Sequence, residues 1–170
     1  AKEEDIAKFY AMYREKGWDV IRQDRHDRMV RLGIIGRETG FAEWENRSWN
    51  ELSEKEKDHT AYRMAVYAAQ VYAMDYNVGR LIEFLKESGQ YDNTLILFLS
   101  DNGACAEPHN ELGGGKQKDI NNPANSGHPS YGGAWAQVST TPLRQDKQRD
   151  DEGEIPTPSH CCRKGCAAAQ

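Results

Sequence analysis

The sequence has no long hydrophobic run, no excess of positive charge and few hydrophobic residues for its length. No apolar run approaches the roughly 20 residues that a membrane-spanning helix needs, so no membrane span is expected. Asp and Glu number 27 against 22 Lys and Arg, and the resulting net charge of -5 argues against a nucleic-acid partner. Only 38% of the 170 residues are hydrophobic, which indicates either a loosely packed chain or a fragment whose core is completed by residues outside this sequence. The opening residues, Ala1–Asp5, contain neither an initiator Met nor a signal-peptide core, which also favours an internal fragment.

Cysteine is scarce as well, with four residues in the chain. Cys105 stands alone, whereas Cys161, Cys162 and Cys166 lie near the C-terminus beside His160. No second ligand pair stands at the spacing of a zinc site, so neither a structural zinc nor a disulfide framework is expected. The thiols do not indicate a cellular compartment.

The spacing of apolar residues predicts three helices, over residues 3–16, 18–32 and 53–88. Glycine and proline interrupt any regular pattern in two other stretches, residues 33–50 and 104–133, which we predict to be loops.

Local signals mark where these helices begin and end. Gly17 separates the first two, and Gly89 provides the left-handed residue that ends the third. Ser53 and Glu56 form a capping-box pattern at the start of the third helix. The third helix carries an apolar stripe at spacings of three and four, which predicts a buried face along its whole length. The stripe consists of Ala61, Met64, Ala65, Ala68, Val71, Val78, Leu81, Ile82 and Leu85.

A short and nearly unbroken apolar run, Thr94–Leu99, follows the long helix. It predicts a strand buried on both faces of a parallel sheet, and therefore an α/β fold. Asp101 and Asn102 come directly after this strand. Open α/β sheets place ligands at the carboxyl ends of their strands, and a carboxylate beside an amide suits Ca²⁺ or Mg²⁺. The alternative is an ordinary turn in which both side chains bond to nearby backbone.

Four blocks of sequence together resemble one known family. They are Met64–Arg80, Leu85–Thr94, Leu95–Glu107 and Thr141–Arg144, in this order along the chain. Over residues 1–158 the chain is similar to arylsulfatase-type sulfatases of the alkaline-phosphatase superfamily. The resemblance implies part of an α/β sandwich with a central mixed sheet, in which the long helix precedes a buried strand.

The resemblance also implies a chemistry. Members of the family hydrolyse sulfate esters with a divalent cation, usually Ca²⁺, and a formylglycine nucleophile made in a Cys/Ser-x-Pro-x-Arg motif. Asp101 and Asn102 match two of the family's metal ligands. Lys147 matches a catalytic lysine whose ammonium group would contact a sulfate or leaving-group oxygen. The alternative for Lys147 is a solvated lysine in a charged run.

The sequence departs from the family pattern in three places. No Cys or Ser is followed by x-Pro-x-Arg, so the formylglycine and the early Asp-Asp metal ligands are expected in an upstream segment absent here. Glu154 stands where the family has glycine, and residues 159–170 do not read as the apolar strand expected there. We therefore divide the chain into a partial catalytic domain, residues 1–158, and a non-family tail, residues 159–170, for which a frameshift is one hypothesis.

The leading hypothesis is a fragment of a sulfuric-ester hydrolase that acts on a sulfated small molecule or glycan and is inactive by itself. A phosphodiesterase or phosphonate hydrolase of the same superfamily is one alternative. A non-catalytic helical interaction fragment and a degenerate pseudoenzyme are the others. By family analogy, the protein would be periplasmic, secreted or lysosomal.

Overall fold

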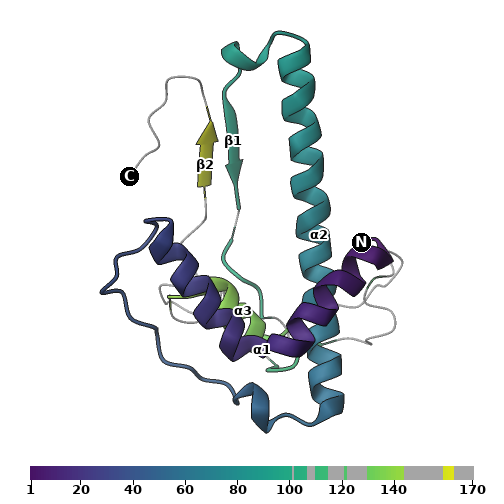
Figure 1. Ribbon diagram of the computed structural model, residues 1–170, viewed down its shortest axis with the longest axis vertical. Helices are drawn as coiled ribbons and strands as arrows, with labels where there is room; N and C mark the ends of the chain where they lie inside the picture. The colour runs from purple at the N-terminus through teal and green to yellow at the C-terminus, as the bar shows by residue number, and fades with distance from the viewer. Residues whose placement is uncertain (101, 107–109, 115–120, 122–129, 144–158, 163–170) are drawn as a thin grey trace.

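Three helices meet at the centre of the computed structural model, and one of them extends far beyond the others beside a strand (Figure 1). The structure describes residues 1–100, 102–106, 110–114, 121 and 130–143, together with the backbone of residues 159–162. The elements in chain order are α1 (Glu3–Arg31), η1 (Trp49–Glu51), α2 (Glu54–Glu87), η2 (Tyr91–Asn93), β1 (Ile96–Leu99), α3 (Gly133–Thr140) and β2 (Ser159–Cys162).

Helix α1 consists of two segments that meet at an angle, as Figure 1 shows. Gly17 lies at the bend with φ 67° and ψ 174°, a conformation that L side chains rarely adopt. The prediction of two helices separated at Gly17 is therefore confirmed. The bend places Trp18, which is fully buried, against the core.

The boundaries of α2 also follow the predicted signals. The Ser53 amide and hydroxyl both donate to Glu56 Oε2, at 2.8 and 2.7 Å, and the Glu56 amide donates to Ser53 Oγ at 3.3 Å. At the other end, the Gly89 amide donates to Lys86 O with φ 70° at Gly89. The capping box and the glycine end are both confirmed.

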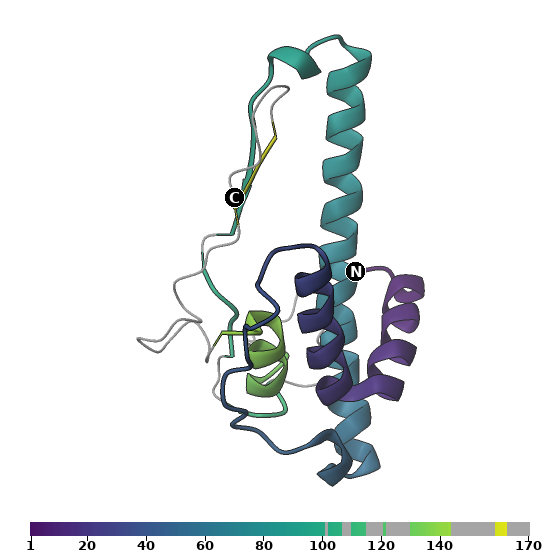
Figure 2. The same cartoon turned by 60° about the vertical axis from the view of Figure 1, so that its left-hand side comes forward.

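Burial along α2 differs between its two halves, which corrects the predicted buried stripe. Ala61, Met64 and Ala65 are buried in the first half, where α2 packs against α1. Val71 and Leu81, which belong to the same stripe, are exposed. Figure 2 shows why: the second half of α2 extends past α1 and α3. The described helices, α2 included, lack the combination of length and apolar character needed to cross a bilayer.

An aromatic cluster forms the core where the helices meet. Trp18 packs edge-on against Trp49 and Trp135, with ring centroids 5.1 and 5.9 Å apart, and Tyr13 contacts Trp135 at 5.1 Å. The buried indole N–H groups are satisfied, because Trp18 Nε1 donates to Arg47 O and Trp135 Nε1 donates to Thr60 O, at 2.9 and 3.1 Å. These bonds connect α1, α2 and α3 through one cluster.

Helix α3 was not predicted from the sequence pattern. It is only eight residues long and follows the predicted glycine-rich loop. Its fully buried residues Ala134, Trp135 and Ala136 occupy the space between α1 and α2. Tertiary packing, rather than helical propensity, therefore stabilises this segment.

The predicted strand forms, but not in the predicted environment. β1 pairs antiparallel with β2, with Ile96 opposite Cys162 and Leu99 opposite Ser159. Leu97, Phe98 and Leu99 are 62%, 46% and 60% exposed, so the prediction of burial on both faces is wrong in this structure. Among the described residues, this two-stranded ladder is the whole sheet.

The C-terminal region also differs from the sequence prediction. Residues 159–170 were expected not to form a strand, yet Ser159–Cys162 form β2. The expectation is therefore wrong for these four residues. Main-chain hydrogen bonding to β1 allows a strand without an apolar sequence pattern, because the ladder uses backbone groups alone.

Candidate functional site

Of the three predicted site residues, the structure describes Asn102. Asn102 lies just past the end of β1 and is exposed. Ser100 Oγ donates to Asn102 O at 2.8 Å, which turns the chain immediately after the strand. Asp101 and Lys147 lie outside the described residues, so their predicted roles remain predictions.

Asn102 lines a pocket of about 510 Å³. Four parts of the fold form its walls: the last turns of α1 with the segment after it, Tyr67 on α2, the segment that leaves β1, and the C-terminal end of α3 with the residues that follow it. The described lining residues are Arg25, Met29, Ile34, Ile35, Thr39, Tyr67, Ser100, Asn102, Gly103, Ala104, Ser139, Thr140, Thr141, Pro142 and Leu143. The pocket thus adjoins the end of the strand that carries the predicted metal ligands.

Arg25 provides the positive charge in this pocket. Its Nε donates to Thr141 O at 3.5 Å, a long contact across the pocket between α1 and the end of α3. Burial of its guanidinium group among protein atoms lowers the pKa of Arg25. The described lining residues include no Asp or Glu, so no carboxylate among them offsets this charge.

Arg25 was not predicted as a site residue from the sequence. A signal was nevertheless present. Arg25 stands four residues before Met29, and residues four apart lie on the same face of a helix. Both residues line the pocket in the structure.

The described residues do not complete a metal site. Among them, no group of three or more His, Cys, Asp or Glu side chains is placed to hold an ion. Asn102 can offer one amide oxygen, whereas Ca²⁺ takes six to eight oxygen ligands. The described part of the chain therefore supplies at most a fraction of a cation shell.

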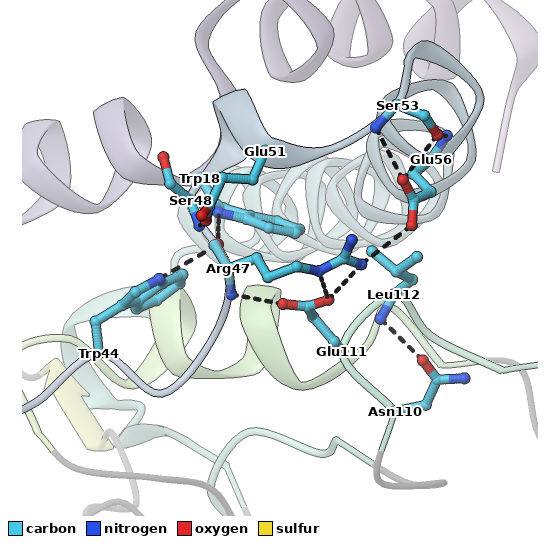
Figure 3. Close-up of polar contacts among 10 residues, drawn as sticks. All are labelled: Trp18, Trp44, Arg47, Ser48, Glu51, Ser53, Glu56, Asn110, Glu111 and Leu112. Carbon is cyan, nitrogen blue, oxygen red and sulfur yellow. Dashed lines mark hydrogen bonds and ion pairs between the residues drawn. The ribbon is translucent and has the colours of Figure 1, made fainter.

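A polar cluster on the opposite side of the core holds the loops that frame α3 (Figure 3). Arg47 Nε donates to Glu111 Oε2 at 2.8 Å, and the Arg47 amide donates to Glu111 Oε1 at 2.6 Å. Arg47 also pairs with Glu56 at 3.1 Å, which connects the loop before η1 to the first turn of α2. These contacts raise the pKa of Arg47, the Glu111 hydrogen bond being the largest cause.

Arg63 holds the same loops from inside the protein. It is 1% exposed and donates from Nη1 to Gly114 O and to Ser130 O, the second bond being 2.9 Å long. Burial lowers the pKa of Arg63. Both carbonyls lie within the predicted loop of residues 104–133, so Arg63 joins two described parts of this loop to α2.

Comparison with known proteins identifies the family. The sequence profile of the family described as Sulfatase matches residues 12–158, most of the chain. This chain belongs to the sulfatase family. An uncharacterized sulfatase of Schizosaccharomyces pombe is 36% identical over 168 residues, which cover 92% of this chain and 30% of that protein. The arylsulfatase of Klebsiella aerogenes is 35% identical over 150 residues, 84% of this chain and 32% of the enzyme.

Another relative comes from the wider superfamily. The multifunctional alkaline phosphatase superfamily protein PehA of Trinickia caryophylli is 41% identical over 49 residues, which cover 29% of this chain and 10% of that protein. The chain spans less than a third of the length of the Schizosaccharomyces pombe and Klebsiella aerogenes relatives.

Family membership confirms the predicted resemblance and carries the alkaline-phosphatase-like α/β fold with it. At the level of the family, the activity is hydrolysis of sulfate esters. Among the described residues, the sheet consists of β1 and β2 alone. The central mixed sheet therefore remains a prediction.

Proposed function

We propose that this chain is part of a sulfuric-ester hydrolase and contributes one side of its active site. The observation that carries the proposal is the position of Asn102, which follows β1 and lines a pocket in a chain of the sulfatase family. The substrate class is a sulfated small molecule or glycan. The central mixed sheet would be completed by chain outside this sequence.

Asp101 and Asn102 are proposed as ligands of a divalent cation, Ca²⁺ or Mg²⁺. A carboxylate and an amide oxygen are suitable ligands for such a hard ion. When bound, the cation would neutralise charge on the sulfuryl oxygens. The Asn102 side chain makes no hydrogen bond within the described part of the chain, so its amide oxygen is available to act as a ligand.

Lys147 is proposed to place its ammonium group near a sulfate or leaving-group oxygen, where a compact positive charge stabilises developing negative charge. The nucleophile, a formylglycine, is proposed to lie in a segment that this sequence does not contain. The 170 residues would then bind and orient the ester without cleaving it. Residues 1–158 would form this part of the catalytic domain, and residues 159–170 a tail unrelated to the family.

The proposal is tested with the longer reading frame that contains this chain. We expect the longer protein to hydrolyse an aryl sulfate, and the 170-residue chain not to. Asp101→Ala, Asn102→Ala and Lys147→Ala should each lower kcat/KM by about 100-fold or more. Asp75→Ala, on the exposed half of α2, is the matched control and should leave the rate unchanged.

Two outcomes would contradict the proposal. Turnover of the aryl sulfate by the purified 170-residue chain would show that no upstream nucleophile is needed. Unchanged turnover in all three site variants of the longer protein would remove these residues from the active site.

A second candidate function is phosphodiester or phosphonate hydrolysis. The similarity to PehA, which is named as multifunctional, favours it as the alternative. A panel of aryl sulfate, aryl phosphate diester and aryl phosphonate on the longer protein decides between them, because the preferred substrate has the highest kcat/KM. A purely helical interaction fragment is less well supported, since β1 and the family match both favour the catalytic fold.

A further inference from the structure

We propose that Arg25 is an oxyanion-binding residue in the pocket that Asn102 lines, and that this pocket accepts an anionic ester with an apolar organic part. The inference rests on the proposed function, which makes the pocket a substrate site. It adds a binding residue on α1 that is separate from the predicted metal ligands and from Lys147.

The hydrogen bonding of Arg25 leaves its donors available. A guanidinium group carries five N–H donors. Within the described part of the chain, the 3.5 Å contact from Nε to Thr141 O is its single hydrogen bond, and no ion pair to it is present. The side chain is exposed while lining the pocket, so the terminal nitrogens can reach a bound molecule.

The electrostatic surroundings favour an anion at this position. Burial of part of the guanidinium group among protein atoms lowers the pKa of Arg25, although the residue as a whole is exposed. A carboxylate or sulfate in the pocket could accept two parallel charge-assisted hydrogen bonds from the guanidinium group. The absence of Asp and Glu among the described lining residues removes any competing partner from that set.

The other walls of the pocket select the uncharged part of the ligand. Met29, Ile34, Ile35 and Leu143 line it with apolar side chains. A site with apolar walls and one charged group binds a ligand with an apolar body and one charged end. An aryl or similarly apolar ester therefore fits the pocket better than a polysulfated polar chain.

Two parts of a substrate could supply the oxyanion: the sulfate that reacts, or a carboxylate on the organic part. Each has at least two oxygens on one central atom, and a guanidinium group can donate to both of them. The probes that distinguish them are 4-nitrophenyl sulfate and 4-nitrobenzoate, with 4-nitroanisole as the neutral analogue.

The test measures binding of these three probes to the 170-residue chain by NMR titration in a buffer with a metal chelator. Arg25→Gln should weaken binding of at least one anionic probe about 10-fold or more and leave 4-nitroanisole unchanged. Arg25→Lys should recover part of the loss, because the charge remains but the planar pair of donors does not. The matched control is Arg28→Gln, an exposed arginine on α1 that does not line the pocket.

The pattern of loss identifies the source of the anion. A larger loss for 4-nitrophenyl sulfate assigns Arg25 to the sulfate, and a larger loss for 4-nitrobenzoate assigns it to a substrate carboxylate. Unchanged affinity for both anions in Arg25→Gln would overturn the proposal. An equal loss for 4-nitroanisole would also overturn it, since that result indicates a structural role.

A kinetic measurement on the longer protein covers the case in which Arg25→Gln is poorly folded alone. There the variant should raise KM for the matching ester by about 10-fold with a smaller change in kcat, and an unchanged KM would refute the proposal. If the longer protein cleaves no sulfate ester while Arg25-dependent binding persists, the proposed function fails and the anion site stands. If the longer protein cleaves the sulfate ester normally and binding does not depend on Arg25, the anion site fails and the proposed function stands.

Discussion

Gly17 and Trp49 lie in direct contact, and the contact leaves no room for a side chain on residue 17. A Cβ atom added to Gly17 would lie 2.3 Å from Trp49 Cγ. The bend of α1 and the docking of η1 therefore depend on the same pair of residues. Because Trp49 also packs against Trp18 and Trp135, this pair connects the bend to the aromatic core.

Replacing Gly17 by alanine should destabilise the protein strongly. The substitution adds the cost of a backbone conformation that essentially only glycine adopts, about 1–3 kcal/mol, to a clash with a buried indole that adds about 1–3 kcal/mol. Gly33→Ala is the matched control, because Gly33 has φ 71° but no atom within 4 Å of the added Cβ. Urea denaturation of both variants measures the difference, and equal losses of stability would show that the Trp49 contact is not tight.

Glu56 should make the stability of the protein depend on acid pH. The Ser53 hydroxyl, the Ser53 amide and Arg47 all stabilise the charged carboxylate, and together they lower the pKa of Glu56 to about 2. A carboxyl whose pKa is lower in the folded state stabilises the fold above its unfolded pKa, near 4.3, and loses this contribution as the pH falls through about 2.

The measurement is the midpoint of thermal unfolding between pH 7 and pH 2. Glu56→Gln should unfold at a lower temperature than the wild type at pH 7, and the gap should close towards pH 2. Glu87→Gln, at the exposed end of the same helix, should follow the wild-type pH profile. A gap that stays constant across this range would show that the charge of Glu56 does not contribute.

Trp135 should be among the most sensitive positions in the core. Its side chain is fully buried and donates to Thr60 O at 3.1 Å. Trp135→Ala should lower the free energy of unfolding by about 3–5 kcal/mol, because it creates a large cavity between three helices. Phe84→Ala removes an aromatic ring that is 60% exposed, so it should cost less than about 1 kcal/mol. Comparable losses in the two variants would contradict the assignment of the core.

Amide hydrogen exchange should divide α2 into two parts. Residues 60–69 contain the buried side chains of this helix, whereas those of residues 74–77 and 79–81 are exposed. Amides in the first part should exchange only on global unfolding, and those in the second part through local opening. Mass spectrometry of a dilute sample measures both rates. Uniform protection along the helix would mean that the second half is covered in solution.

Helix boundaries were predictable because the signals that set them are local. Ser53 and Gly89 act through their own backbone geometry and through neighbours within four residues. The backbone conformation of Gly17 is also local, although its contact with Trp49 is not. The extent of burial was not predictable in the same way. Val71 and Leu81 continue the apolar stripe of α2, yet they are exposed because α1 and α3 contact only the first half of that helix.

The candidate site, like the fold, was predictable only where its features depend on local sequence. An apolar run followed by Asp101 and Asn102 was enough to predict a strand that ends at polar ligands, and the structure confirms β1 just before Asn102. Arg25 was not predicted, because it lies about 75 residues before Asn102 in the chain. Its position opposite the end of β1 exists only after folding. Likewise, β2 formed from residues with no apolar pattern, through backbone pairing with β1.

Short-range pattern therefore defined the ends of α1 and α2 and the strand before Asn102, and four ordered blocks of sequence indicated the sulfatase family. Three-dimensional packing decided which half of α2 is buried, which strand pairs with β1 and which charged residue lines the pocket. The physical reason is range: capping and turn formation involve neighbouring residues, whereas burial and pocket lining require contacts between segments far apart in the chain.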